Sequence, residues 1–133
     1  MALDIFAAFA TDETKELEGV WIELSDGAEI LVARAGNKKY NKLLAQQYEK
    51  NKRLLDLKND AAETLSNTIM IDVMARTLLL GWKNVVFKGE DLPHSVDNAK
   101  LLLSVKDFRD LVSKHAGDAE AFRLAQLDEA AKN

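Results

Sequence analysis

The 133-residue sequence contains no cysteine, only one proline and only two histidines. The absence of cysteine excludes disulfide bonds, thiolate zinc sites and cysteine nucleophiles. The two histidines, His94 and His115, have no further histidine or cysteine at the spacing that a zinc site requires. No glycine-rich phosphate loop, Walker-type lysine or Gly-x-Ser-x-Gly motif is present. We therefore predict no catalytic residue, no metal and no cofactor, and expect that the protein is not an enzyme.

Long apolar runs are also missing, since no stretch approaches the roughly 20 residues that span a bilayer. The first six residues hold an acid, Asp4, and no base, unlike the basic start of a secretory signal. Apolar residues make up 47% of the chain, which is enough to form a hydrophobic core in a domain of this length. We predict a single soluble cytosolic domain over residues 1–133, with no membrane partner.

The hydropathy pattern predicts a helix-dominated α+β fold with one N-terminal β-hairpin, then two long helices and two to three short helices. Apolar residues alternate on both sides of Asp26 and Gly27, a pair that accepts the positive φ angles of a tight turn. The hairpin is therefore predicted at about 18–35, and helices at about 38–58, 61–80, 96–104, 106–116 and 118–130. Asn37 and Asp118 are predicted N-caps. Because residues 61–80 are apolar almost all round their centre, we expect them to form the central helix.

Charge is unevenly distributed along the chain, although the net charge is only −4. Residues 1–35 carry eight acids and two bases, whereas residues 36–58 carry seven bases and two acids. Opposite patches attract and orient an encounter, so the asymmetry predicts self-association. The candidate residues are Glu23, Asp26 and Glu29 of the hairpin, and Lys38, Lys39 and Lys42 of the basic helix. The alternative is that the lysines only form a solvated helix face.

The basic helix at 38–58 also raises nucleic-acid binding as an alternative function, because lysines can neutralise phosphates. The net negative charge and the sequence pI of about 5.2 oppose it. We therefore regard a nucleic-acid partner as the weaker interpretation.

Seven positions are candidates for contact with a protein partner. Two lie in an apolar N-terminal segment, two lie at the middle of the stripe of the helix at 38–58, two methionines lie one turn apart in the helix at 61–80, and one tryptophan follows that helix. Methionine pairs can line adaptable binding grooves. The candidates are Phe6, Phe9, Gln47, Tyr48, Met70, Met74 and Trp82. For each of them, ordinary core packing is the alternative.

Two segments of the chain resemble a known protein family. The segments are LLGWKNV at 79–85, at the end of the apolar helix, and LPHSVDNAKLL at 92–102, after a turn with glycine and proline. Together they resemble the tail assembly chaperones of long-tailed bacteriophages, which show an apolar helix ending near a tryptophan and then a Ser-x-x-Asn-Ala-x-x-Leu-Leu pattern. The hairpin and the helix rich in tyrosine and lysine are compatible with small phage tail proteins.

The resemblance implies a non-enzymatic role in the cytoplasm of an infected bacterial host. Such chaperones bind the long helical tape measure protein, prevent its aggregation, are displaced by the tail tube protein and are absent from the mature virion. A long amphipathic helix needs its apolar stripe covered reversibly, and several copies along one client would bind through multivalency. A phage tail structural or tail-completion subunit is the alternative within the same class.

Overall fold

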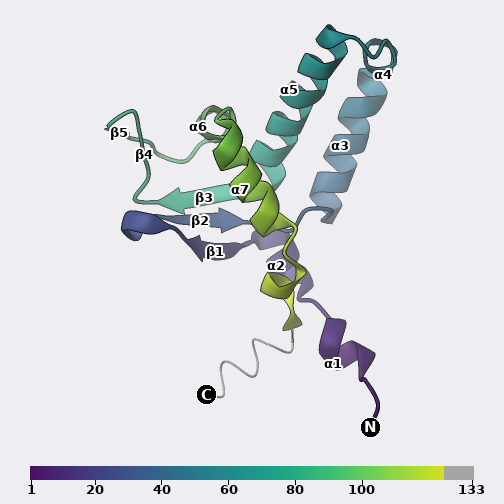
Figure 1. Cartoon of the computed structure of the whole chain (residues 1–133), viewed down its shortest axis with the longest axis vertical. Helices are drawn as coiled ribbons and strands as arrows, with labels where there is room; N and C mark the ends of the chain where they lie inside the picture. Colours follow the sequence, from purple (N-terminus) through teal and green to yellow (C-terminus); the bar gives the residue numbers. More distant parts are fainter. Residues whose placement is uncertain (125–133) are drawn as a thin grey trace.

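A computed structural model of the chain describes residues 1–124 and has the predicted helix-dominated α+β fold (Figure 1). Its helices are α1 (Ile5–Phe9), α2 (Glu13–Glu18), α3 (Lys38–Lys50), α4 (Lys52–Leu55), α5 (Asp60–Thr77), α6 (Val96–Leu103) and α7 (Lys106–Ala116), with 3-10 turns η1 (Ser25–Gly27) and η2 (Ala119–Phe122). Its strands are β1 (Val20–Glu23), β2 (Glu29–Val32), β3 (Leu79–Lys83), β4 (Val86–Phe87) and β5 (Glu90–Asp91).

The predicted hairpin is formed by β1 and β2, which pair antiparallel across the η1 turn. At the turn, Asp26 has a φ of 60° and Gly27 a φ of 74°, the left-handed backbone for which an Asp-Gly pair is suited. The backbone N–H of Leu24 donates to the carbonyl of Ala28 at 2.8 Å and closes the turn. The hairpin is therefore encoded locally, by strand alternation and turn chemistry.

A third strand, β3, joins β2 on its other side, so the sheet order is β1-β2-β3. The prediction of a helix at 61–80 is wrong at its end, because α5 stops at Thr77 and the chain enters β3 at Leu79. The N–H of Ala33 donates to the carbonyl of Leu78 at 2.9 Å, and Leu79 then pairs with Val32. If the helix continued, the backbone N–H and C=O groups on this edge of β2 would have no partners. Pairing with β3 satisfies them.

The core lies between one face of the sheet and the helices α5, α6 and α7. On the sheet side, Ile30 stands opposite Trp82 in the register, and both are buried. Buried Leu103 of α6 and Val112 of α7 complete the same cluster. In Figure 1, α3 and α5 rise together from the sheet, while α6 and α7 cross over it. Because α5 contacts α3, α6 and β3, it occupies the central position that its apolar composition predicted.

The other predicted helices differ from the structure mainly where the chain turns. The predicted helix at 38–58 is divided, because α3 ends at Lys50 and the short α4 follows Asn51. Asn51 donates its side-chain N–H to the carbonyl of Gln47 at 2.8 Å, which competes with continuation of the helix. The predicted helices at 96–104 and 106–116 correspond to α6 and α7.

The predicted helix at 118–130 is wrong in its first part. Residues 119–122 form the 3-10 turn η2, and the chain is then extended at Arg123, which forms an isolated β-bridge with Thr11. The bridge draws the chain back to the N-terminal segment and ends the turn. The rest of that predicted helix, residues 125–130, lies outside the described residues.

Candidate protein-binding surfaces

The N-terminal arm, residues 3–9, exposes more large apolar side chain than any other short segment of the described chain. Its members Leu3, Ile5, Phe6 and Phe9 are between 53% and 72% exposed. Asp4 caps α1 by accepting a hydrogen bond of 3.2 Å from the N–H of Ala7. None of the residues of α1 is buried within the described part of the chain.

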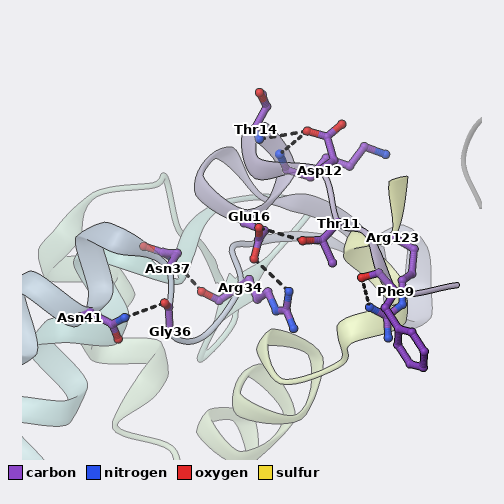
Figure 2. A network of polar contacts seen from close by, with 11 residues as sticks. Phe9, Thr11, Asp12, Thr14, Glu16, Arg34, Gly36, Asn37, Asn41 and Arg123 are labelled. Carbon is purple, nitrogen blue, oxygen red and sulfur yellow. Dashed lines mark hydrogen bonds and ion pairs between the residues drawn. The ribbon is translucent and has the colours of Figure 1, made fainter. Parts of the chain in front are cut away.

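The root of this arm is held firmly on the domain (Figure 2). The N–H of Asp12 donates to the carbonyl of Phe122 at 2.8 Å, beside the bridge between Thr11 and Arg123. The Arg123 guanidinium donates to the carbonyl of Phe9 at 2.8 Å and lies 5.3 Å from the centre of the Phe9 ring. The arm therefore leaves the domain at a fixed position.

A polar network continues from the arm root to the start of α3 (Figure 2). Thr11 donates its hydroxyl to the Glu16 carboxylate at 3.0 Å, and the same carboxylate pairs with Arg34 at 2.9 Å. Asn37 donates its side-chain amide to the carbonyl of Arg34 at 2.8 Å, and accepts from the N–H of Tyr40 at 2.9 Å as the predicted N-cap. This network ties α2, the end of β2 and α3 into one support.

An apolar groove lies at the other end of the hairpin, beside η1. Its walls come from the turn after β1, from β4 and from the junction of α6 and α7. Its apolar lining includes Leu24, Val86, Phe87, Leu102, Val105 and Phe108, around a volume of about 460 Å³. Val86 is 57% exposed and Val105 is 45% exposed, so the groove is open to solvent.

The groove is held in shape by hydrogen bonds within and between the segments that form its walls. Asn84, with a φ of 55°, donates its side-chain amide to the carbonyl of Gly27 at 3.0 Å. This bond fixes the hairpin turn to the connector between β3 and β4. The N–H of Leu92 donates to the carbonyl of Val85 at 3.2 Å and holds the base of the β4-β5 hairpin. The groove is therefore preformed, which lowers the entropic cost of binding.

The sequence did not identify this groove, because its walls come from three separate segments of the chain. The available signal was the apolar run from Val85 to Phe87 inside an otherwise polar connector. That run is too short to predict a strand. In the structure its two last residues form β4, which pairs with β5 through the positive-φ residues Lys88 and Gly89.

Four of the predicted partner-binding residues lie at the extremes of exposure. Phe6 and Phe9 are exposed on the N-terminal arm, whereas Met74 and Trp82 are 2% and 9% exposed. The buried pair belongs to the core cluster, although Trp82 also lines a surface hollow beside Pro93 and His94. Of these four residues, Phe6 and Phe9 are the exposed pair.

The other three predicted partner-binding residues are half-buried between α3 and α5. Gln47 and Tyr48 lie on α3, and the Tyr48 hydroxyl is 3.5 Å from the Ser66 hydroxyl of α5. The Tyr40 hydroxyl contacts the sulfur of Met70 at 3.9 Å. These contacts hold the two helices together. Whether any of these residues also touches a partner stays a prediction.

The candidate charges lie on separate parts of the surface. Glu23 and Glu29 face each other across the hairpin, with exposed Asp26 in its turn. Lys38 pairs with Glu13 at 2.7 Å, and this hydrogen bond raises the pKa of Lys38 and lowers the pKa of Glu13. Lys39 and Lys42 are exposed on α3. Lys38 is thus already engaged within the chain, and contact between these patches of two copies stays a prediction.

Within residues 1–124, no three histidine, aspartate or glutamate side chains gather where they could hold a metal ion. None of the helices in this range is both long and apolar enough to cross a membrane.

Comparison with known proteins identifies a family for this chain. A family model described as YdaY prophage protein matches residues 35–133, well over half of the chain. The match begins at Ala35, directly after β2, and therefore includes α3 to α7 but not the N-terminal arm or the hairpin. No curated protein and no solved structure matches the chain. The chain belongs to the YdaY prophage protein family and is a phage-associated protein.

Proposed function

We propose that this protein is a phage tail assembly chaperone that binds and solubilises the tape measure protein during tail morphogenesis. It acts without catalysis, by covering apolar surface of a long helical client. The observation that carries the proposal is the open, preformed apolar groove bounded by Leu24, Phe87, Leu102, Val105 and Phe108. The prophage family and the resemblance of residues 79–102 to tail chaperones support the same function.

The groove suits an amphipathic helix. Helix recognition uses apolar side chains of the ligand at positions i, i+3, i+4 and i+7, inserted between apolar walls. Here Phe87 and Phe108 are half-buried and Val86 and Val105 are exposed, so a client side chain would contact them without any rearrangement of the core. One groove of this size covers only a short part of a long client. Several copies along the client would add their affinities through multivalency.

The place of action in this proposal is the cytoplasm of the infected bacterial host. The tail tube protein displaces the chaperone as it polymerises around the tape measure, so the chaperone is absent from the mature virion. A shallow, partly exposed groove suits a chaperone that must be displaced. It would bind the client weakly enough for the tube protein to compete successfully for it.

Co-expression with the tape measure protein of the same prophage tests the proposal. We expect the wild-type chain to keep the client in the soluble fraction, and Val105→Glu to reduce that fraction several-fold by placing a charge in the groove. Leu57→Glu is the matched control, because Leu57 is 61% exposed but lies away from the groove. A client that sediments equally with and without this chain would refute the chaperone function.

A phage tail structural or tail-completion subunit is the alternative function within the same class. It predicts that the chain is present in purified virions, which mass spectrometry of particles would detect. The nucleic-acid alternative depends on the basic surface of α3 and α4. It predicts a steep loss of DNA or RNA binding with added salt, and no retardation at low salt would exclude it.

A further inference from the structure

We infer that Asn84 is a positioning residue of the apolar groove. Its side chain holds the turn of the β1-β2 hairpin and the strand β4, which form two of the groove walls, at the separation that a client helix needs. Asn84 lies in the connector between β3 and β4 and lines the groove with a polar side chain. The inference rests on the proposed function, because it assigns a role to a residue of the same groove.

The two walls that Asn84 joins come from segments that the main sheet does not hold together. The residue pair at this end of the β2-β3 ladder is Glu29 with Lys83, so the ladder ends before the turn residues 25–28 and before β4. The strand β4 pairs with β5 in a separate two-stranded sheet, and an isolated two-stranded hairpin is marginal in water. The position of β4 relative to the hairpin turn therefore depends on bonds outside the main sheet.

The Asn84 side chain supplies such a bond. Its amide nitrogen donates to the carbonyl oxygen of Gly27 at 3.0 Å, across 57 positions of the sequence. Asn84 itself has a φ of 55°, a left-handed conformation that asparagine adopts more readily than most residues. The residue thus ends the extended strand β3 and at the same place directs an N–H donor to the hairpin turn. Because Val86 follows two residues later, the bond fixes the start of the β4 wall.

Two other hydrogen bonds near the connector act in a different direction. The N–H of Leu92 donates to the carbonyl of Val85, and the indole N–H of Trp82 donates to the carbonyl of Leu92. These bonds hold the β4-β5 hairpin to the end of β3, whereas the Asn84 bond reaches the turn of the β1-β2 hairpin. Without the Asn84 amide, the two walls should move relative to each other while the core stays packed. Ordering them again on binding costs free energy, so the affinity for a client falls.

A distance measured across the groove in the full chain tests this role without a client. The chain has no cysteine, so Ser25→Cys and Glu90→Cys, both at exposed positions, accept a pair of nitroxide labels. Electron paramagnetic resonance then gives the distribution of distances between the two labels. At about pH 7 we expect Asn84→Asp to broaden this distribution, because a carboxylate cannot donate to the Gly27 carbonyl. At about pH 3 the protonated carboxyl can donate its O–H, and the distribution should narrow again.

Asn41→Asp is the matched control for the lost amide. The Asn41 side chain donates to the carbonyl of Gly36 at 2.8 Å and is exposed, as Asn84 is, but it does not line the groove. In the labelled chain, Asn41→Asp should keep the distribution of the wild type at both pH values. Since both hydrogen bonds are exposed, thermal unfolding should show that both variants are folded.

Co-expression with the tape measure protein gives the second readout. We expect Asn84→Asp to reduce the soluble client about two- to tenfold, the effect of one lost hydrogen bond, and Asn41→Asp to match the wild type. An Asn84→Asp variant with the wild-type distances, or with the wild-type amount of soluble client, would overturn the inference. An equal loss in Asn41→Asp would also overturn it, as would broadening that persists at about pH 3 while the wild type stays narrow. If the wild type itself leaves the client insoluble, the proposed function fails, and the label distances alone decide the role of Asn84.

Discussion

The indole N–H of Trp82 donates a hydrogen bond of 2.6 Å to the backbone carbonyl of Leu92, ten residues further along the chain. The Trp82 ring also meets the His94 ring edge-on, with centroids 4.9 Å apart. Trp82 lies on β3, so this pair of contacts fixes the return of the connector after β4 and β5 to the sheet. The position of the groove wall formed by β4 thus depends on a buried side chain that does not line the groove.

Replacing Trp82 with phenylalanine should lower the free energy of unfolding by about 1–2 kcal/mol, because the Leu92 carbonyl loses its donor in a partly buried setting. Urea denaturation followed by circular dichroism measures the change. Trp21→Phe is the control, since the Trp21 ring is 43% exposed and lies 4.1 Å from the Lys83 ammonium. That control should cost less than about 1 kcal/mol. Equal losses in the two variants would contradict the role given to the hydrogen bond.

Alanine substitutions at Gly19 and Gly36 separate the cost of steric overlap from the cost of backbone strain. Both have positive φ, 88° and 86°, but a Cβ at Gly19 would lie 3.1 Å from the Leu31 side chain and from the Val32 carbonyl carbon, whereas a Cβ at Gly36 would meet nothing within 4 Å. We expect Gly36→Ala to cost about 1–2 kcal/mol through strain alone. Gly19→Ala should cost about 1–3 kcal/mol more, because of the added overlap. Thermal or urea unfolding that shows equal costs would contradict this difference.

Asp72 should make the stability of the fold depend on pH. Partial burial by itself would raise the pKa of Asp72, but the hydrogen bonds and charges of Lys100 and Arg76, both 2.9 Å away, outweigh it and lower the pKa. A lowered folded-state pKa contributes stability above the unfolded pKa of about 4, and that contribution is lost as pH falls through the folded value. Asp72→Asn should therefore destabilise the protein at pH 7 and have little effect near pH 2. A destabilisation that is the same at both values would exclude this ion cluster as its source.

The predicted contact between the hairpin acids of one copy and the basic helix of another should weaken as salt is added. If Glu23 and Glu29 of one copy attract Lys39 and Lys42 of another, association should weaken as salt rises from about 0.02 to 0.5 M, because screening shortens the range of exposed charges. Light scattering of the wild type and of the double variant Glu23→Lys/Glu29→Lys measures this effect. Association that resists salt and survives the double variant would contradict this prediction.

Local features of the fold were predictable because each depends on a few neighbouring residues. The Asp26-Gly27 turn and the Asn37 cap of α3 form as expected, since a positive φ and an unpaired N–H are satisfied within four residues of the chain. The end of α5 was not predictable from the same signals. Residues 78–80 are three leucines, which suit a helix or a buried strand equally well by pattern, and only the free edge of β2 selects the strand.

The candidate binding residues were likewise only partly predictable from the sequence. The apolar pattern of residues 3–9 is enough to identify Phe6 and Phe9 as candidates, but the same reasoning includes Met74 and Trp82, which the fold buries. Apolar character is a property of the residue, whereas exposure depends on which elements pack over it. The groove was missed because Leu24, Val105 and the short apolar run that contains Val86 lie in three segments that meet only in the folded chain.

By itself, the sequence determined the fold class, the hairpin turn, the helix caps and the absence of cysteine chemistry. These follow from composition and from interactions between residues close together in the chain. Only the tertiary structure decided that residues 79–83 form a third strand, that Phe6 and Phe9 are exposed, and that an apolar groove lies at the hairpin turn. The physical reason is that backbone pairing and burial at these places depend on contacts between residues far apart in sequence, whose strength is set by the geometry of the assembled fold.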